Sequence, residues 1–345
     1  MLLKLHEIIK HFQLSGSIKQ ILPVEIGHIN QTYKVVVEKS SVETGFILQR
    51  INHFVFKKPA EVMDNIVRVG QHLNGKNYPK KVLMPLPAKN GLYYVRDHEE
   101  GYWRLYPFID NTRSFNEVRT EEMAYKGAFT FGEYLQFLDD FDCRQLHYTI
   151  PDFHNTNLRY QDYYFTLKNC SKARLGAAQQ CITDLAAYRF LLGPVQKIKL
   201  PLRVVHSDTK INNILFDKHS GEAVCVVDLD TLMPGWLIFD YGDMVRTFTP
   251  PVDENSECYE EVYIRKNILR ALTSGILDGL GDRIQPLEKS LLIYGAKVTI
   301  FEQALRFLTD YLKGNLYYKV NREDQNLIRA KNQVVLLKDL EKCTR

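Results

Sequence analysis

The sequence has few cysteines, no long apolar run and almost no excess of charge. Six cysteines are scattered over the 345 residues without a C-x-x-C pair, which argues against zinc and disulfide scaffolds and predicts a reduced, cytoplasmic protein. No stretch approaches the roughly 18 uninterrupted apolar residues of a membrane helix, so we expect no membrane association. Basic residues outnumber acidic ones by only 45 to 41 and form no stripe, so nucleic acid is not an expected partner.

What is present is the composition of an ordinary globular protein. Hydrophobic residues make up 45% and charged residues 25% of the chain, which excludes a disordered or collagen-like protein. The apolar start resembles a signal peptide, but charged residues interrupt it, and apolar positions from Leu2 to Phe12 recur at helical spacing. We therefore predict an amphipathic first helix rather than a leader.

The expected fold class is α+β with two lobes, residues 1–107 and 108–345. The first lobe has strand-like runs at 18–26, 32–38, 45–49, 91–95 and 102–109 and a helical pattern at 60–73. Three strands, a helix and two strands indicate a small antiparallel sheet. The second lobe has helical patterns at 117–141, 157–169, 182–192, 259–274, 287–312 and 327–340, with short strands at 202–205, 213–216 and 223–228.

One motif is misleading. Residues 70–76 match G-x-x-x-x-G-K, the opening of a phosphate-binding loop, but Asn77 stands where Ser or Thr holds magnesium. The run also closes a predicted helix, whereas a phosphate-binding loop follows a strand and opens a helix. We therefore interpret Gly75 as the cap at the end of that helix.

The informative chemistry lies between residues 202 and 246. An apolar strand leads into His206-Ser207-Asp208, Asn213 follows five residues later, and a second strand ends at Asp228. We expect the strand ends to bring Asp208, Asn213 and Asp228 together. One carboxylate that orients a hydroxyl, with a carboxamide and a carboxylate that hold magnesium, is the set that phosphoryl transfer from ATP requires.

Simpler interpretations exist for each of these side chains. Asp208 and Asn213 are residue types that favour turns, and Asp228 could be an exposed charge at a strand end. His206 is more typical of a buried hydrogen-bonding support than of a catalytic base. Asp230 is either a second metal contact or a structural carboxylate.

The segment resembles the aminoglycoside phosphotransferase and choline kinase superfamily, whose fold is similar to that of protein kinases. The H-x-D-x-x-x-x-N core carries this resemblance. Narrower motifs resemble the N-acetylhexosamine 1-kinases of amino-sugar salvage, and the likeness covers nearly the whole chain. They are GHINQTY (27–33), FILQRIN (46–52), WRLYPFID (103–110), DTKINN (208–213), DLDTLMPG (228–235), FDYGD (239–243) and RFLTDYLKGNLYY (306–318).

The resemblance implies a nucleotide-binding lobe over 1–107, a catalytic and sugar-binding lobe over 108–345, and ATP and Mg²⁺ as cofactors. Asp208 would be the catalytic carboxylate, and Asn213 and Asp228 would bind magnesium. The residues that would meet the nucleotide are Gly27, Gln49 or Arg50, Tyr106, Phe108 and Asp110. Those that would meet the sugar are His28, Asn30, Arg306 and Tyr317; for His28 and Asn30 a hairpin turn is an equal alternative.

Two positions stay open. The superfamily usually places a lysine in the third strand, where this chain has Gln49 and Arg50; strand alternation puts these on opposite faces, so only one can point to the phosphates. Arg306 lies off the apolar stripe of its helix. It is either a sugar contact or a solvated ion-pair residue with Glu302 and Asp310 at helical spacing.

The expected function is ATP- and magnesium-dependent phosphorylation of the anomeric hydroxyl of N-acetylglucosamine or N-acetylgalactosamine by a monomer. A kinase of another small alcohol, such as an aminoglycoside or an amino alcohol, is the alternative enzyme. The acidic stretch after Arg246, at 247–261, leaves room for such a cationic substrate. An inactive sugar-binding pseudokinase is the alternative without catalysis.

Overall fold

The chain forms two compact units, each built from segments that are separate in the sequence. A computed structural model describes residues 2–24, 29–193 and 198–344. The sheet unit comprises Met1–Arg113, Asp140–Pro151 and Leu215–Pro234, and the helical unit comprises Ser114–Asp139, Asp152–Ile214 and Gly235–Arg345. The α+β fold class is confirmed, and the division into lobes at residues 107 and 108 stays a prediction.

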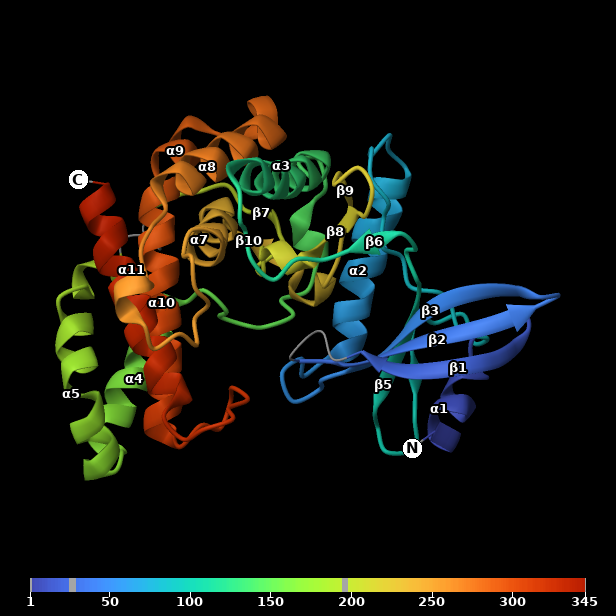
Figure 1. Ribbon diagram of the computed structural model, residues 1–345, viewed down its shortest axis with the longest axis horizontal. Coiled ribbons are helices and arrows are strands. Elements are labelled where there is room, and N and C mark those ends of the chain that lie inside the picture. Colours follow the sequence, from blue (N-terminus) through green and yellow to red (C-terminus); the bar gives the residue numbers. More distant parts are fainter. Residues whose placement is uncertain (1, 25–28, 194–197, 345) are drawn as a thin grey trace. The chain divides into compact units, whose positions relative to one another are not determined.

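An antiparallel sheet with strand order β1-β2-β3-β5-β4 organises the sheet unit (Figure 1). Its strands are β1 (Ser17–Val24), β2 (Gln31–Lys39), β3 (Val42–Ile51), β4 (Val95–Arg96) and β5 (Tyr102–Pro107). Alternation along the strands places one apolar set, which includes Tyr33, Val35, Leu48, Trp103 and Leu105, in a single buried cluster.

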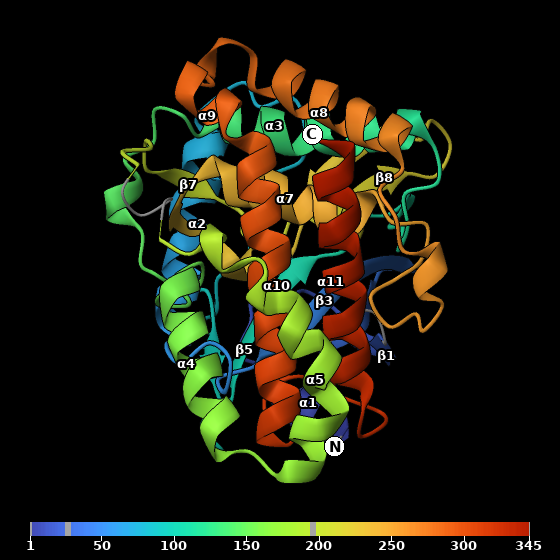
Figure 2. The same ribbon diagram turned by 90° about the vertical axis from the view of Figure 1, so that its left-hand side faces the viewer.

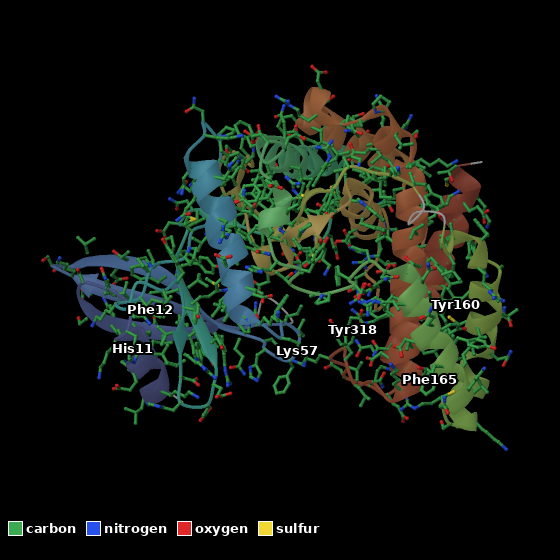
Figure 3. All side chains as sticks on the ribbon, turned by 180° about the vertical axis from the view of Figure 1, so that it is seen from behind. His11, Phe12, Lys57, Tyr160, Phe165 and Tyr318 are labelled. Carbon is green, nitrogen blue, oxygen red and sulfur yellow. The ribbon has the colours of Figure 1, made fainter. Side chains whose placement is uncertain are left out.

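The amphipathic first helix is confirmed as α1 (Leu2–Ile9), which supplies Leu5, Ile8 and Ile9 to that cluster. Phe12 follows the helix and is also buried there, while its neighbour His11 is exposed (Figure 3). The helical spacing of the apolar residues therefore identifies the face of α1 that packs against the sheet.

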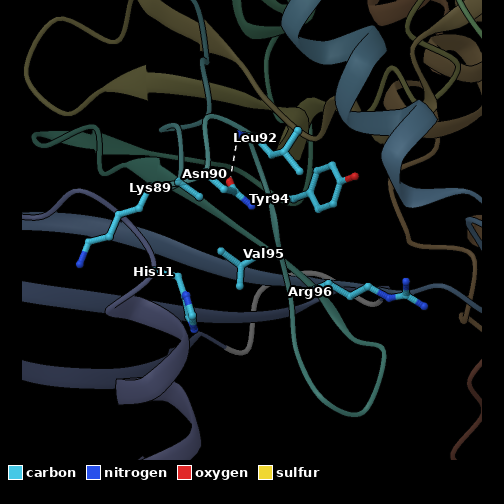
Figure 4. Close-up of a pocket in the computed structure, with 8 residues that line it drawn as sticks. His11, Lys89, Asn90, Leu92, Tyr94, Val95 and Arg96 are labelled. Carbon is cyan, nitrogen blue, oxygen red and sulfur yellow. Dashed lines mark hydrogen bonds between the residues drawn. The ribbon is translucent and has the colours of Figure 1, made fainter.

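The predicted strand at 91–95 is wrong except at its end, because a turn replaces most of it. Asn90 accepts a hydrogen bond from the amide of Leu92 at 3.0 Å, and Gly91 adopts a left-handed φ of 81° (Figure 4). Turn chemistry outweighs the strand propensity of the residues that follow, and only β4 pairs with β5.

Helix α2 (Pro59–Asn74) confirms the reading of the glycine-lysine run as a helix end. Pro59 stands at its first position, and the Gly75 amide closes its last turn by donating to the Gln71 carbonyl. A small second sheet in the same unit has the order β6-β8-β9, with β6 (Thr112–Arg113), β8 (Ile214–Asp217) and β9 (Ala223–Val226). The 3-10 helix η4 (Leu229–Thr231) follows β9.

Helices dominate the helical unit. They are α3 (Glu121–Phe137), α4 (Thr156–Asn169), α5 (Lys172–Ala186), α7 (Leu237–Phe248), α8 (Lys266–Leu280), α9 (Pro286–Ser290), α10 (Leu292–Lys313) and α11 (Gln325–Cys343). Strand β7 (Arg203–Val205) lies among them in the sequence, and β10 (Met233–Gly235) precedes α7. Two predicted boundaries shift: Ser171 caps α5 ten residues earlier than expected, and α8 begins at Lys266 instead of residue 259.

Helix α10 runs through the centre of the helical unit and packs against α11, α7 and α4 (Figure 2). Helices α3 and α8 cross closely because glycines remove side chains at the contact. A Cβ on Gly275 would lie 2.3 Å from the carbonyl oxygen of Tyr125. Within residues 2–24, 29–193 and 198–344, none of the helices has the length and apolarity to cross a bilayer.

Candidate functional site

A buried carboxylate fixes the backbone in front of Asp208. Strand β7 leads into His206 and Ser207, whose amides donate to the two carboxylate oxygens of Asp240 on α7, both at 2.8 Å. The Thr209 hydroxyl donates to the Asp240 carbonyl at 2.6 Å. Ser207 has a φ of 63°, a left-handed conformation that is strained for a residue with a side chain. Asp240 therefore holds a loop that the backbone alone would not adopt.

The Asp240 side chain is fully buried. Burial raises the pKa of Asp240 to about 7, although the two amide hydrogen bonds and His154 favour its ionised form. The carboxyl group thus titrates near neutral pH, and its hydrogen bonds to the loop are sensitive to pH.

Asp208 itself lies between two polar neighbours. Lys210 Nζ is 2.9 Å from Asp208 Oδ1, and Asn213 Nδ2 donates to Asp208 Oδ2 at 3.0 Å and to the Asp208 carbonyl at 2.8 Å. Burial opposes ionisation of Asp208, but the Lys210 ammonium outweighs it, with smaller help from His206 and Asn213, so its pKa lies below the ordinary value. Asp208 is therefore an ionised, oriented carboxylate, and the structure brings it together with Asn213 as predicted.

The charge of Lys210 is balanced on more than one side. Asp208 is the main cause of its raised pKa, and Asp243 and Glu254 add to the effect while Arg246 opposes it. Arg246 is itself paired with Asp243 at 2.8 Å and with Glu254 at 2.8 Å. An alternating set of carboxylates and cations therefore lies beside Asp208.

His206 fits the role of a support better than that of a base. Its side chain is fully buried, and its ring lies edge-on to Phe131 with the ring centres 5.3 Å apart. A group that solvent and substrate cannot reach is poorly placed to exchange a proton with a substrate.

In the sheet unit, the residues after β9 meet a buried cation that sequence reasoning missed. Arg104 on β5 is 1% exposed, and its Nη1 donates to Asp230 Oδ1. Its Nε and Nη2 donate to Gln49 Oε1 on β3 at 3.1 and 2.9 Å. The signal in the sequence was a single charge inside the apolar run WRLYPF.

Gln49 and Arg50 do lie on opposite faces of β3, as alternation requires. Gln49 points to Arg104 and also donates to the Thr32 hydroxyl at 3.2 Å. The Arg50 guanidinium lies 5.9 Å from the ring centre of Trp103, which belongs to the apolar cluster covered by α1. Gln49 is thus on the face of the buried polar network and Arg50 is on the apolar face.

Asp230 is a structural carboxylate in this unit. It is 2% exposed, pairs with Arg104, and accepts a hydrogen bond from Asn30 Nδ2 at 2.7 Å. Asn30 Oδ1 in turn accepts a hydrogen bond from the backbone amide of Asn52 at 3.0 Å. The side-chain amide of Asn30 therefore bridges two parts of the fold, while a role in sugar binding stays a prediction.

Tyr106, Phe108 and Asp110, which are predicted to meet the nucleotide, occupy different environments. Tyr106 is buried, and the Arg104 guanidinium lies 5.2 Å from its ring centre. The Phe108 amide already donates to the Gly45 carbonyl at 3.0 Å, and Lys34 lies 3.9 Å over the Phe108 ring. Asp110 is exposed. Gly27 and His28 lie outside the described residues, and contacts of all these positions with a nucleotide or sugar stay predictions.

Arg306 in the helical unit is surrounded by aromatic rings. Its guanidinium lies 4.9, 5.9 and 5.6 Å from the ring centres of Phe153, Tyr317 and Tyr318, and Nη1 donates to Gln303 at 3.1 Å. Gln303 also donates to the Tyr318 hydroxyl at 3.2 Å. Arg306 and Tyr317, both predicted sugar contacts, are therefore brought together.

The expected acidic partners of Arg306 are occupied elsewhere. Glu302 binds His154 at 3.2 Å and the Thr156 hydroxyl at 2.9 Å. Asp310 accepts the amides of Leu316, Tyr317 and Tyr318 at 2.8 to 2.9 Å, and this folds the segment after α10 back toward Arg306. Both acids thus have other partners, although, against the effect of burial, Tyr318, Tyr317 and Glu302 still help to raise the pKa of Arg306, and both interpretations of Arg306 stay predictions. Tyr318, at the end of this segment, is labelled in Figure 3.

One cavity in the sheet unit lies apart from these residues. It measures about 610 Å³ and is lined by His11, Lys89, Asn90, Leu92, Tyr94 and Arg96, among others (Figure 4). None of the predicted site residues lines it. It therefore forms no part of the candidate site.

The donor chemistry of the predicted metal ligands suits a hard cation. Asn213 uses its amide nitrogen toward Asp208, so its carboxamide oxygen is the atom that a cation would contact. Asp228 precedes η4 and has a left-handed φ of 58°. Carboxamide and carboxylate oxygens are ligands that Mg²⁺ accepts, so the residues fit the ion. That Asp228 joins Asp208 and Asn213 stays a prediction.

Comparison with known proteins places these features in one family. The family model described as "Phosphotransferase enzyme family" matches residues 20–261. A spectinomycin phosphotransferase, solved with ADP and spectinomycin, is 14% identical with a TM-score of 0.63 and covers 99% of this chain and 98% of its own. A microcompartment-associated aminopropanol kinase is 15% identical, with a TM-score of 0.61 and coverage of 99% and 98%. Choline kinase from Cryptosporidium parvum Iowa II is 12% identical, with a TM-score of 0.57 and coverage of 99% and 96%.

Proposed function

Because the chain belongs to the phosphotransferase enzyme family, a family of small-molecule kinases, we propose a specific reaction for it. It transfers the terminal phosphoryl group of ATP to the anomeric hydroxyl of N-acetylglucosamine or N-acetylgalactosamine. The products are the sugar 1-phosphate and ADP. A nucleotide donor is supported by the similar spectinomycin phosphotransferase structures, which are complexes with ADP and with AMP.

The observation that carries the proposal is the ionised Asp208 between Lys210 and Asn213. Its carboxylate accepts the proton of the sugar hydroxyl as the hydroxyl oxygen forms a bond to the γ-phosphorus. The bond from that phosphorus to the bridging oxygen breaks, and ADP leaves with the electron pair. The anomeric hydroxyl is more acidic than an ordinary alcohol, so a weak base with a lowered pKa suffices.

Asn213 and Asp228 are the residues that we assign to magnesium. When bound, the ion neutralises charge on the phosphate oxygens of ATP. The role of the chain is to fix its two oxygen ligands: Asn213 through its hydrogen bonds to Asp208, and Asp228 through the turn that begins η4.

The Arg306 cluster supports a neutral sugar as the acceptor. We define this cluster as Arg306, Phe153, Gln303, Tyr317 and Tyr318. Aromatic rings cover the apolar face of a sugar, and a guanidinium with a carboxamide offers the polar partners that hydroxyl and acetamido groups need. A fixed positive charge at this place would also repel a cationic acceptor.

The alternative is a cationic acceptor such as an amino alcohol or an aminoglycoside. The similar structures favour it, since they include a spectinomycin phosphotransferase, an aminopropanol kinase and a choline kinase. The acidic stretch at 247–261 argues less for it than the sequence suggested. Glu254 is paired with Arg246, and Glu257 with Arg322, so part of that negative charge is neutralised within the helical unit.

A panel of acceptors tests the proposal. The protein is incubated with ATP and Mg²⁺ and with N-acetylglucosamine, N-acetylgalactosamine, glucose, spectinomycin, choline or aminopropanol. Products are identified by mass and by phosphorus NMR, which distinguishes an anomeric phosphate from a phosphate at another hydroxyl. We expect 1-phosphates from the two N-acetylhexosamines and little product otherwise. Phosphorylation of choline, aminopropanol or spectinomycin alone would establish the alternative.

Replacing Arg306 tests the sugar site within that reaction. We expect Arg306→Ala to raise KM for the sugar by about 10- to 150-fold, because a charge-assisted hydrogen bond is worth roughly 1.5–3 kcal/mol. KM for ATP should change little. Arg283→Ala is the matched control, since Arg283 is 61% exposed in the same unit. A lower melting temperature with unchanged sugar KM would make Arg306 a packing residue and remove it from the site.

A further inference from the structure

The third strand of this chain carries no lysine, but a buried cation reaches its position from the neighbouring strand. Arg104 on β5 donates two hydrogen bonds to Gln49 on β3 and one to Asp230 within η4. Its Nη1 also lies 3.8 Å from the Met63 sulfur on α2. The guanidinium therefore joins two strands, a helix and the turn after β9.

Arg104 is poorly suited to bind a phosphate directly. Its side chain is 2% exposed, and so is that of its partner Asp230. A buried ion pair is retained only where further hydrogen bonds satisfy both groups, and here Gln49 and Asn30 supply them. The planar fork of arginine makes two bonds to the carboxamide and one to the carboxylate in a fixed geometry, which the compact ammonium of lysine does not reproduce.

The turn that this network holds is the one that begins with Asp228. Asp228 precedes η4 with a φ of 58°, a conformation that persists in a non-glycine residue only where its surroundings impose it. Asp230, two residues later, is fixed by Arg104 on one oxygen and by Asn30 on the other. The η4 segment also lies against α2. The anchor and the strained residue are thus one short turn apart.

We propose that Arg104 is a positioning residue that acts through Asp230 to hold Asp228 in the conformation that presents its carboxylate to magnesium. This inference rests on the proposed phosphotransfer function. Gln49 then serves to orient Arg104 and does not bind the nucleotide phosphates. Without the guanidinium, Asp228 and Asp230 would be left as two nearby carboxylates that repel each other, and the turn would open.

The test uses Arg104→Lys and Arg104→Met, with Arg50→Lys and Arg50→Met as matched controls on the opposite face of the same sheet. Calorimetry measures the affinity for ADP with and without Mg²⁺, and thermal unfolding is recorded on the same preparations. We expect the Arg104 variants to raise the magnesium concentration at half-saturation by about tenfold or more, with magnesium-free ADP affinity within about twofold of wild type. The Arg50 variants should match wild type in both.

Steady-state kinetics and a variant of Asp230, the ion-pair partner of Arg104, extend the test. Arg104→Lys should lower kcat with an unchanged sugar KM, and Asp230→Asn should raise the magnesium midpoint in the same way. If the Arg104→Met variant does not fold, Arg104→Lys and Asp230→Asn carry the test. Equal loss of ADP affinity with and without magnesium would identify Arg104 as a phosphate ligand and overturn the inference. A lowered melting temperature with an unchanged magnesium midpoint would overturn it too.

Measurements on the wild-type protein distinguish a failure of this inference from a failure of the proposed function on which it rests. If wild type binds no nucleotide and phosphorylates no acceptor, the proposed function fails, and the inference loses its premise. If wild type shows magnesium-dependent ADP binding and sugar phosphorylation while the Arg104 variants keep the wild-type midpoint, the inference alone is overturned.

Discussion

Replacing Asp240 with asparagine isolates the carboxylate that holds the backbone in front of Asp208. In the wild type, each Asp240 oxygen accepts one amide at 2.8 Å, from His206 and from Ser207. An asparagine oxygen can accept only one of them, and its NH2 group then faces the other donor. The change keeps the shape of the side chain and removes one acceptor.

The magnitude follows from the amide that is left without a partner. A buried donor with no acceptor costs about 1–3 kcal/mol. Ser207 is already strained at a φ of 63°, so the loop relaxes where this support is lost. If this free-energy cost loosens the loop that presents Asp208, kcat decreases by about 5- to 150-fold. Nucleotide KM should stay near the wild-type value.

The pH dependence of stability gives an independent readout. The pKa of Asp240 is raised to about 7 in the folded protein from about 3.8 in the unfolded chain. The folded state therefore holds more protons between these values, and the contribution of Asp240 to stability is lost as pH rises from about 4 to 7. The slope is at most about 1.4 kcal/mol per pH unit. Asp240→Asn should lack this component of the curve.

The assay compares wild type, Asp240→Asn and the control Asp278→Asn, whose carboxylate meets the Tyr125 hydroxyl at the surface of α8. Steady-state kinetics and denaturant unfolding are measured at intervals from pH 4 to 8. The control should match wild type in kcat and in pH slope. If Asp240→Asn also has wild-type kcat and an unchanged slope, then Asp240 neither orders the loop nor titrates in this range, and the reasoning is refuted.

Three further predictions concern Asp208, the two proposed magnesium ligands and the helix packing. Asp208→Asn should lower kcat by at least about 100-fold with ATP binding nearly intact, as measured by turnover and calorimetry; near-normal kcat would remove Asp208 from the mechanism. Asn213→Ala and Asp228→Ala should each raise the magnesium concentration for half-maximal activity, and an unchanged midpoint in both would contradict the metal assignment. Gly275→Ala should destabilise the protein by about 1–3 kcal/mol, because its Cβ would lie 2.3 Å from a carbonyl oxygen. Gly176→Ala on α5, where nothing lies within 4 Å, should instead stabilise it by roughly 0.5–1 kcal/mol; equal unfolding midpoints for the two variants would refute the packing argument.

Local patterns explain which parts of the fold could be predicted from the sequence. Strands β1 to β3 and helix α2 show clear periodicity, and the structure places them within a few residues of the prediction. The run at 91–95 failed because the Asn90 turn overrides the propensity of the residues that follow. The start of α5 was missed because its signal was a single capping side chain, Ser171, which accepts from the Arg174 amide.

The candidate site likewise contains contacts that the sequence could reveal and contacts that it could not. Asp208 and Asn213 are five residues apart, and the short segment between them fixes their contact, so a motif could reveal it. Arg104 and Asp230 are separated by 126 residues, and a buried pair of this kind follows only from tertiary packing. Asp240 was part of a recognised motif, but its role depends on how α7 packs against the loop after β7.

The surroundings of three arginines in this chain also bear on the substrate. Arg104 and Arg246 are both buried, and carboxylates neutralise each of them: Asp230 for the first, Asp243 and Glu254 for the second. Arg306 instead meets aromatic rings and a carboxamide, while Glu302 and Asp310 on its own helix are bound to other groups. A guanidinium in such a setting keeps its positive field and its donors for a partner that brings acceptor oxygens without a positive charge. An acetamido sugar meets both conditions, and a choline or aminoglycoside cation does not, which is why the acceptor panel and Arg306→Ala test the same physical distinction.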